Sequence, residues 1–339
     1  MESTRERIGG MADLSTTYLG LPVSSPILLA SSSFSNRTEN LRVAEQHGAG
    51  AVVLRSLFEE QIEAADTALQ EVLSYGAEST AEAQTFFPSQ RVGPAEYLEL
   101  VSRAKRTVSI PVIGSLNCVA PGSWSQYARQ IAEAGADALE VNLYAVQADP
   151  SVTAAEVEAR YEEVVASIVE TVKIPVSVKL SPFFTALAHL VSRLERRGAR
   201  GFVLFNRFLQ PDISLERMSL QNVMPLSQPN EMLLPLRWIA LLHGRVKADL
   251  AATTGIHDAS GVAKQLLAGA TVVQLASVLV NKGLAQIETI RDGLDAWMDK
   301  RGFSEIADFR GSLSQRVVRD PGAFERAQYV HLILSQNVP

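Results

Sequence analysis

Residues 248–283 read ADLAATTGIHDASGVAKQLLAGATVVQLASVLVNKG and contain two consecutive strand–turn–helix units. The short apolar strands ADLAA and TVVQL each end in a turn of small residues, Thr253-Thr254-Gly255 and Ala276-Ser277. Asp258 is the predicted N-cap of the helix after the first turn. Small residues let a phosphate approach the backbone, and paired turns of this kind form the phosphate site after strands 7 and 8 of a (β/α)8 barrel. The stretch therefore predicts a barrel that binds a phosphorylated ligand.

A weak internal repeat extends this pattern along the chain. Gly-Ala followed by an apolar run begins at Gly50, Gly135, Gly198 and Gly269, each time after an amphipathic helix. We expect these glycines to end their helices in a left-handed conformation, before a buried strand. Pro111 and Pro175 mark a second kind of strand start, because proline breaks the preceding helix. The predicted strands lie at residues 26–30, 51–55, 112–117, 138–142, 176–179, 201–206, 248–252 and 271–275.

Eight βα units predict a single (β/α)8 TIM barrel, an α/β fold. A doubly wound sheet is the alternative, but it usually has a glycine fingerprint after strand 1, where this chain reads LLASSSFS. Long connections at residues 57–93 and 207–231 follow strands 2 and 6 and leave the catalytic face of the barrel. The segment after Lys300 predicts a helical C-terminal cap. We expect residues 1–12 to be a disordered leader and residues 13–339 to form one barrel domain.

Composition narrows the class of protein. The chain has 339 residues, of which 47% are hydrophobic and 20% charged, as in ordinary soluble globular proteins. The net charge of −6 argues against a nucleic-acid partner, and no apolar run is long enough for a membrane span. The single cysteine, Cys118, excludes an intrachain disulfide and favours a cytoplasmic protein. The five histidines show no metal-binding spacing, so we expect no metal site.

Polar residues at the C-terminal ends of barrel strands are candidates for ligand contacts. Lys179 stands in the apolar run VSVKLSP, where its charge needs an anionic partner or must be suppressed. It could face a bound cofactor, form a Schiff base with a substrate, or pair structurally with Glu140. Asn142 and Asn206 each offer a donor and an acceptor, and the alternative for both is a loop-capping amide.

Two further strand ends carry residues that are candidates for binding the substrate. Asn117 closes the third strand with a polar side chain. Arg55 is a fixed cation at the end of strand 2, with a salt bridge to Glu59 or Glu60 as its alternative role.

At these residues the chain resembles the dihydroorotate dehydrogenase family of FMN-binding barrels, over residues 17–313. The most specific segments are PILLASSS, ALEVNLY, VSVKLSPFF, ATTGIHDASGVAKQLLAGATVVQLASVL and GFSEIADFRGSL. The resemblance implies an FMN-dependent oxidoreductase that acts on a CH–CH bond, in a family known from pyrimidine metabolism. It places Ala30 and Ser31 along the flavin, Asn142 and Lys179 at its polar edge, and Asn206 near the substrate or the flavin pyrimidine. Its implied phosphate ligands are Thr253, Thr254, Gly255, Ala276 and Ser277.

The chain departs from the family around the substrate. The family carries a Ser or Cys general base in an Asn-Leu-Ser-Cys-Pro-Asn loop, whereas residues 142–147 read NLYAVQ. Ala145 takes the position of the base and cannot accept a proton, which leaves Tyr144 as the nearby proton donor. Gln147 stands in place of an Asn that binds orotate, and Arg55 in place of a Lys. The family's Asn-Ser-Met-Gly-Leu substrate loop is absent from residues 76–89.

The cofactor half of the site is thus kept and the orotate half is changed. This predicts a dihydroorotate dehydrogenase-like flavoprotein with a different small substrate, whose anionic group Arg55 and Arg207 could receive beside Asn117 and Gln147. Three alternatives stay open: an authentic dihydroorotate dehydrogenase with another base, a Schiff-base aldolase using Lys179, and a non-catalytic FMN-binding partner of a redox enzyme. A homodimer or a redox partner protein is equally open.

Overall fold

The computed structural model describes residues 12–58, 93–118, 124–143, 145–207, 210–222, 225–325, 330 and 333–334. The predicted leader up to residue 11, most of the long connection after strand 2, and Tyr144 lie outside these residues. Ala12 is buried, and its backbone N–H donates to Asp295 Oδ1 at 2.7 Å.

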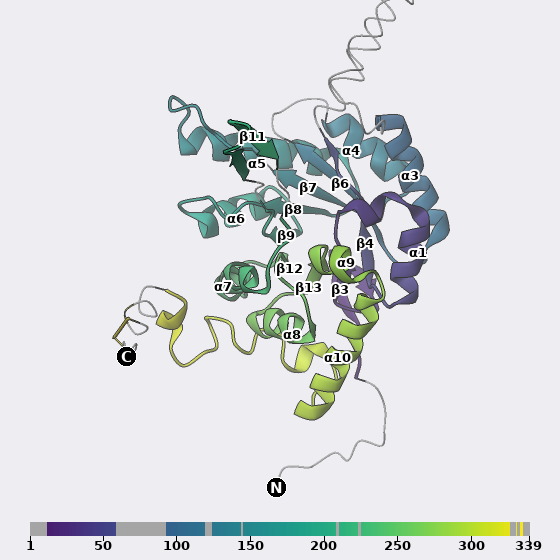
Figure 1. Cartoon of the computed structure of the whole chain (residues 1–339), viewed down its shortest axis with the longest axis vertical. Coiled ribbons are helices and arrows are strands. Elements are labelled where there is room, and N and C mark those ends of the chain that lie inside the picture. Colours follow the sequence, from purple (N-terminus) through teal and green to yellow (C-terminus); the bar gives the residue numbers. More distant parts are fainter. Residues whose placement is uncertain are drawn as a thin grey trace, which may run out of the picture.

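Parallel strands close into a barrel with helices around it, as Figure 1 shows. The barrel strands are β3 (Ile27–Leu29), β4 (Ala51–Val53) with β5 (Leu57–Phe58), β6 (Val112–Cys118), β7 (Ala138–Leu143), β8 (Val176–Leu180), β9 (Gly201–Leu204), β12 (Asp249–Thr253) and β13 (Val272–Leu275). β4 and β5 share one barrel position, because both pair with β6. β13 pairs with β3 and closes the ring. The eight predicted strands are confirmed.

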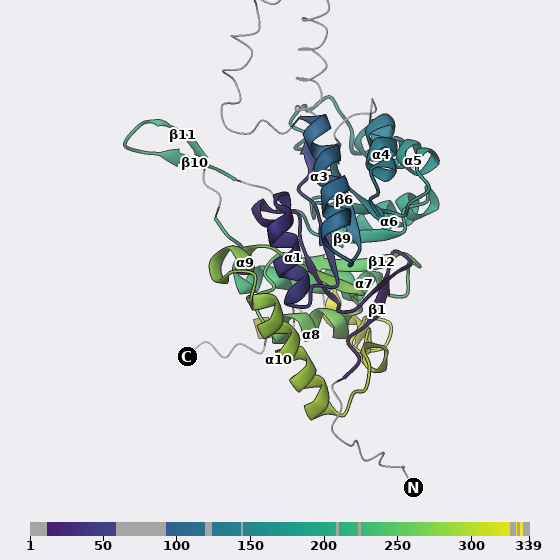
Figure 2. The ribbon, with the colours of Figure 1, turned by 90° about the vertical axis from the view of Figure 1, so that its right-hand side faces the viewer.

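Helices of the barrel follow the strands in the order that the repeat predicts (Figures 1 and 2). They are α1 (Thr38–Gln46), α3 (Pro94–Thr107), α4 (Trp124–Glu133), α5 (Ala154–Thr171), α6 (Leu187–Arg196), α7 (Leu233–Leu242), α8 (Ala259–Ala268), α9 (Ser277–Lys282) and α10 (Gln286–Arg301). Asp258 caps α8 by accepting from Gly261 N at 2.8 Å, as expected. Among the described helices, none is long and apolar enough to cross a bilayer.

The glycine repeat has one exception. Gly135, Gly198 and Gly269 have φ values of 104°, 100° and 119°, so they end their helices in the left-handed region as predicted. The prediction for Gly50 is wrong, because α1 ends at Gln46 and Gly48 takes the left-handed conformation with φ 90°. Gly50 instead lies against the carbonyl oxygen of Ser25, where a side chain would not fit.

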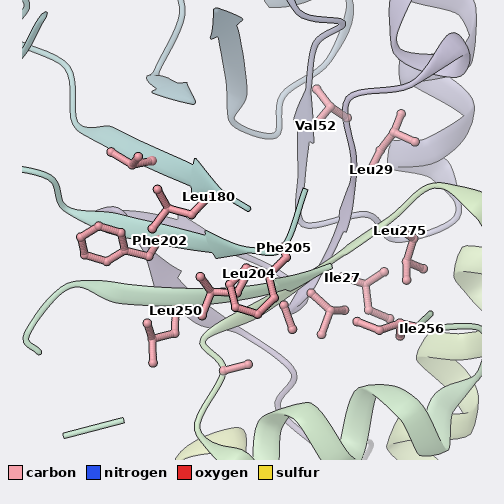
Figure 3. Packing of buried hydrophobic residues seen from close by; sticks show 14 of the residues in the cluster. Ile27, Leu29, Val52, Leu180, Phe202, Leu204, Phe205, Leu250, Ile256 and Leu275 are labelled. Carbon is pink, nitrogen blue, oxygen red and sulfur yellow. The ribbon is translucent and has the colours of Figure 1, made fainter. Parts of the chain in front are cut away.

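Apolar side chains fill both faces of the barrel strands. Ile27 and Leu29 of β3 belong to the outer core between strands and helices, whereas Leu28 belongs to the inner cluster. Figure 3 shows part of the outer core, in which Phe202, Leu250 and their neighbours lie along the strands. Burial on both faces explains why these strands read as continuous apolar runs in the sequence.

A short hairpin closes the N-terminal end of the barrel. β1 (Thr16–Tyr18) and β2 (Leu21–Val23) pair antiparallel, and the turn residues Leu19 and Gly20 have φ values of 56° and 79°. Tyr18, Leu19 and Val23 are buried against the inner cluster of the barrel. This hairpin was not among the predicted elements.

A second hairpin belongs to the long connection after β9. β10 (Pro211–Ser214) pairs antiparallel with β11 (Ser219–Asn222) and projects from the body of the protein, on the side away from β1 (Figure 2). Between α10 and Glu325 the chain consists mainly of turns and the short 3-10 helices η4 (Ile306–Asp308) and η5 (Pro321–Phe324). Two more 3-10 helices, η1 (Ser33–Asn36) and η3 (Pro229–Met232), follow β3 and precede α7.

Candidate active site

A cavity of about 440 Å³ lies where the C-terminal ends of the barrel strands meet. This is the end of a (β/α)8 barrel that carries active sites, and the volume lies in the range of small-molecule pockets. All the residues predicted to contact FMN line it: Ala30, Ser31, Asn142, Lys179, Asn206, Thr253, Thr254, Gly255, Ala276 and Ser277. Parallel pairing brings these strand ends together, although they are spread over most of the chain.

Amide side chains form one wall of the cavity. Strand register places Asn117 beside Asn142, and Asn142 beside Lys179, at one level of β6, β7 and β8. Asn206 Nδ2 donates to Asn142 Oδ1 at 3.1 Å, which fixes the orientation of the Asn142 amide. Its nitrogen is then free to donate to a ligand in the cavity.

Lys179 belongs to a buried polar group that spans the barrel. Its Nζ lies 3.4 Å from Glu140 Oε1 and 3.5 Å from Gln274 Oε1. Gln274 Nε2 donates to Glu140 Oε2 at 2.6 Å, and Glu140 is only 1% exposed. A buried carboxylate needs such partners. Lys179 therefore pairs with Glu140, which is one of the three roles considered for it, and it also lines the cavity.

The predicted phosphate turns lie at the other end of the cavity. Thr254 and Gly255 have φ values of 78° and 73°, which is unusual for a β-branched residue such as Thr254. The Thr254 hydroxyl donates to Phe205 O at 3.1 Å, and the Thr253 hydroxyl donates to Gln274 O at 3.2 Å. Both threonine hydroxyls thus donate to backbone carbonyls, and neither hydrogen is left for an anion.

The end of the long connection predicted after strand 6 covers these turns, although sequence reasoning assigned no role to its residues other than Arg207. Residues 225–232, which we call the strap, precede α7 and lie against Gly255, where a side chain would meet Met232 N and Gln228 O. Ser227 N donates to Ser277 Oγ at 3.1 Å, and Gly255 N donates to Ser227 Oγ at 3.2 Å. Ser227 therefore links the turn after β12 to the turn after β13.

Arg207 holds the strap from the opposite side. Its Nε lies 3.2 Å from Glu231 Oε2, and its Nη1 donates to Pro225 O at 2.5 Å. Arg207 lines the cavity, as predicted for a substrate residue, but three of its nitrogens already bond to the strap. Its first role in this structure is therefore to clamp the strap.

Only some of the other residues predicted to bind the substrate line the cavity. Asn117 lines the cavity, whereas Arg55, Ala145 and Gln147 are not among the described residues that line it. Gln147 is exposed, and Ala145 is partly exposed in the loop after β7. Burial lowers the pKa of Arg55, whose guanidinium makes no ion pair with a described residue. Glu59 and Glu60, its expected partners, lie outside the described residues.

The residues present fit FMN. Amide and ammonium groups at one end suit a flat ring with a polar edge, and the two turns suit a phosphate at the other. Ser32 Oγ is a buried cavity atom that makes no hydrogen bond to any described residue, so it too could meet a ligand. Within the described part of the chain, no His, Cys, Asp and Glu side chains cluster in a way that could hold a metal ion.

A sequence model of the family described as dihydroorotate dehydrogenase matches residues 13–298 of this chain. The chain belongs to the dihydroorotate dehydrogenase family. A relative from Aeropyrum pernix, provisionally named dihydroorotate dehydrogenase A (fumarate), is 26% identical over 88% of this chain and 97% of its own length. The catalytic subunit of dihydroorotate dehydrogenase B (NAD(+)) from Thermoplasma acidophilum is 26% identical, over 89% of this chain and 99% of the relative. The corresponding subunit from Pyrococcus abyssi is 26% identical, over 88% of this chain and 98% of the relative.

Membership of this family makes the protein an oxidoreductase. It also weighs against the aldolase alternative, as does the engagement of Lys179 Nζ with Glu140 and Gln274.

Proposed function

We propose that the protein is an FMN-dependent oxidoreductase that acts on a CH–CH bond of a small substrate other than dihydroorotate. The observation that supports this most is the contrast within one site. The residues expected to contact FMN line one cavity, while an alanine stands where the family has its general base. The first part argues for the cofactor, and the second argues against the family's usual substrate.

When bound in this cavity, FMN would supply the chemistry of hydride acceptance. Lys179 would place its ammonium at the polar edge of the flavin, where it stabilises negative charge. Glu140 and Gln274 hold that ammonium in place. Asn142, oriented by Asn206, would donate to the same edge of the ring.

The substrate proton must leave by a route that differs from that of the family. Ala145 has no group to accept it. Tyr144 remains the candidate, and it lies outside the described residues. Arg55 and Arg207 remain candidates for an anionic group of the substrate, although Arg207 first has to share its guanidinium with Glu231.

The visible absorption spectrum of the purified protein tests the cofactor. We expect flavin bands, with FMN released on denaturation. A protein that stays colourless after reconstitution with excess FMN would contradict the proposal. A yellow protein that no dihydropyrimidine or related compound reduces would instead favour the non-catalytic FMN-binding alternative.

The electron acceptor can be tested on the same sample. The relatives' names give fumarate for one and NAD(+) for others, so both are the first acceptors to offer to the reduced protein. Reoxidation by one of them, and not by the other, would assign the acceptor class.

A further inference from the structure

The phosphate end of the cavity lacks the hydroxyl donors that its sequence suggests. A phosphate accepts hydrogen bonds, so each group that binds it must bring a hydrogen. Thr253 and Thr254 give their hydroxyl hydrogens to Gln274 O and Phe205 O. Hydroxyl donors for an anion must therefore come from other residues.

Ser227 and Ser277 are in the opposite situation. The oxygen of each accepts a backbone N–H, from Gly255 at 3.2 Å and from Ser227 at 3.1 Å. Neither hydroxyl donates a hydrogen bond to a described residue, and both residues line the cavity. A hydroxyl whose oxygen already accepts a hydrogen bond becomes a better donor, because neighbouring hydrogen bonds polarise one another.

We propose that Ser227 is a phosphate-binding residue of this chain, whose hydroxyl donates to the FMN phosphate together with that of Ser277. This inference rests on the proposed FMN-dependent function. It names a residue outside the two strand-end turns, brought to the site by the strap. The hydrogen-bond chain runs from Gly255 N–H to Ser227 Oγ, and from its hydrogen to the phosphate.

The strap holds Ser227 in place before any ligand arrives. Ser227 is 3% exposed, so its position is set by packing as well as by hydrogen bonds. The Arg207–Glu231 pair and the close approach to Gly255 fix the strap on both sides of it. A donor that is already in position loses little conformational entropy on binding.

Comparison of two flavins isolates the phosphate. Dissociation constants of FMN and of riboflavin, which lacks the phosphate, are measured by flavin fluorescence on the flavin-free full chain. We expect Ser227→Ala to weaken FMN roughly 10- to 100-fold, the scale of a hydrogen bond to a charged group, and to leave riboflavin unchanged. Ser227→Thr, which keeps the hydroxyl, should retain most of the preference for FMN.

Ser181→Ala is the matched control. Ser181 is also buried and accepts a backbone N–H, from Phe183 at 3.3 Å, but it does not line the cavity. It should leave the ratio of the two affinities unchanged. If Ser227→Ala weakens both flavins equally, or neither, Ser227 has only a structural role and the inference is wrong. Failure of the unaltered chain to bind FMN at all would instead overturn the proposed function.

Discussion

The residues predicted to bind the cofactor and those predicted to bind the substrate are held in different ways. The cavity lining from β8 to β13, which we call the cofactor wall, consists of strand ends and the strap. Its residues bond to one another or to neighbouring residues, as Lys179 does with Glu140 and Ser227 with Gly255. The predicted substrate residues after β4 and β7 lie in loops, and Arg55, Ala145 and Gln147 fall outside the described lining. Residues fixed by a sheet keep their place in a family, whereas loops can change the substrate without changing the barrel.

The largest expected effect concerns dihydroorotate itself. If only the cofactor wall is kept, the protein should hold FMN, yet dihydroorotate should reduce it about 10²–10⁴-fold more slowly than in a relative that has the base. Anaerobic bleaching of the flavin absorption measures this rate. Ala145→Cys should not restore it, because Arg55 and Gln147 differ as well.

Rapid bleaching of the unaltered protein would break the comparison and favour an authentic dihydroorotate dehydrogenase with another base. Rapid bleaching in Ala145→Cys alone would show that the orotate pocket survives in the loops.

The next effect is on the cofactor wall. Lys179→Met leaves the buried Glu140 carboxylate without its cation and should lower the free energy of unfolding by about 3–5 kcal/mol in urea titrations. It should also make the bound flavin harder to reduce, because the reduced form loses a counter-charge.

A double variant separates these two consequences. Lys179→Met with Glu140→Gln removes the unpaired charge, so most of the stability should return while the reduction potential stays low. An unchanged potential in a variant that still binds FMN would refute the role of Lys179 at the flavin.

A smaller effect sharpens the account of the phosphate turn. Thr254→Asp places a negative charge beside the phosphate and should weaken FMN by roughly 1–3 kcal/mol in a binding titration. Thr254→Gly is the matched control, because glycine adopts the φ of 78° without strain and the backbone of the turn is kept. Equal loss of affinity in both variants would show that the threonine side chain itself binds the phosphate.

The smallest effect belongs to the clamp on the strap. Arg207 and Glu231 are partly exposed, with 28% and 36% of their side chains accessible. A double-mutant cycle with Arg207→Ala and Glu231→Ala should give a coupling of about 0.2–1 kcal/mol in unfolding, as for exposed ion pairs. A coupling of several kcal/mol would mean that the clamp supports the whole cavity rather than one segment.

Local signals predict the barrel well. The glycine and proline positions that mark strand starts act over a few residues, so they can be read from sequence, and Asp258 caps its helix as its type suggests. Gly50 shows the limit of this reasoning. Its glycine is required by contact with Ser25, a residue 25 positions away, rather than by its own helix.

The strap shows what the sequence could not reveal. Ser227 lies 28 residues from Gly255 and 50 from Ser277, and no local pattern distinguishes it from other serines. The sequence also could not reveal that the hydroxyls of Thr253 and Thr254 already donate to backbone carbonyls. Their acceptors, Gln274 O and Phe205 O, lie in β13 and directly after β9. The residue types led to the proposal of FMN as the ligand, whereas the directions of the hydroxyl hydrogen bonds can be read only from the three-dimensional structure.

The hairpin β1–β2 determines the order in which ligands can enter and leave the cavity. Tyr18, Leu19 and Val23 fill the N-terminal end of the barrel with buried side chains, so molecules reach Lys179 from the opposite mouth. Whatever occupies the deep end of the cavity must arrive first and depart last. If FMN takes that deep position, as proposed, a compound bound above it should slow the release of FMN, so that the protein would retain FMN best during turnover.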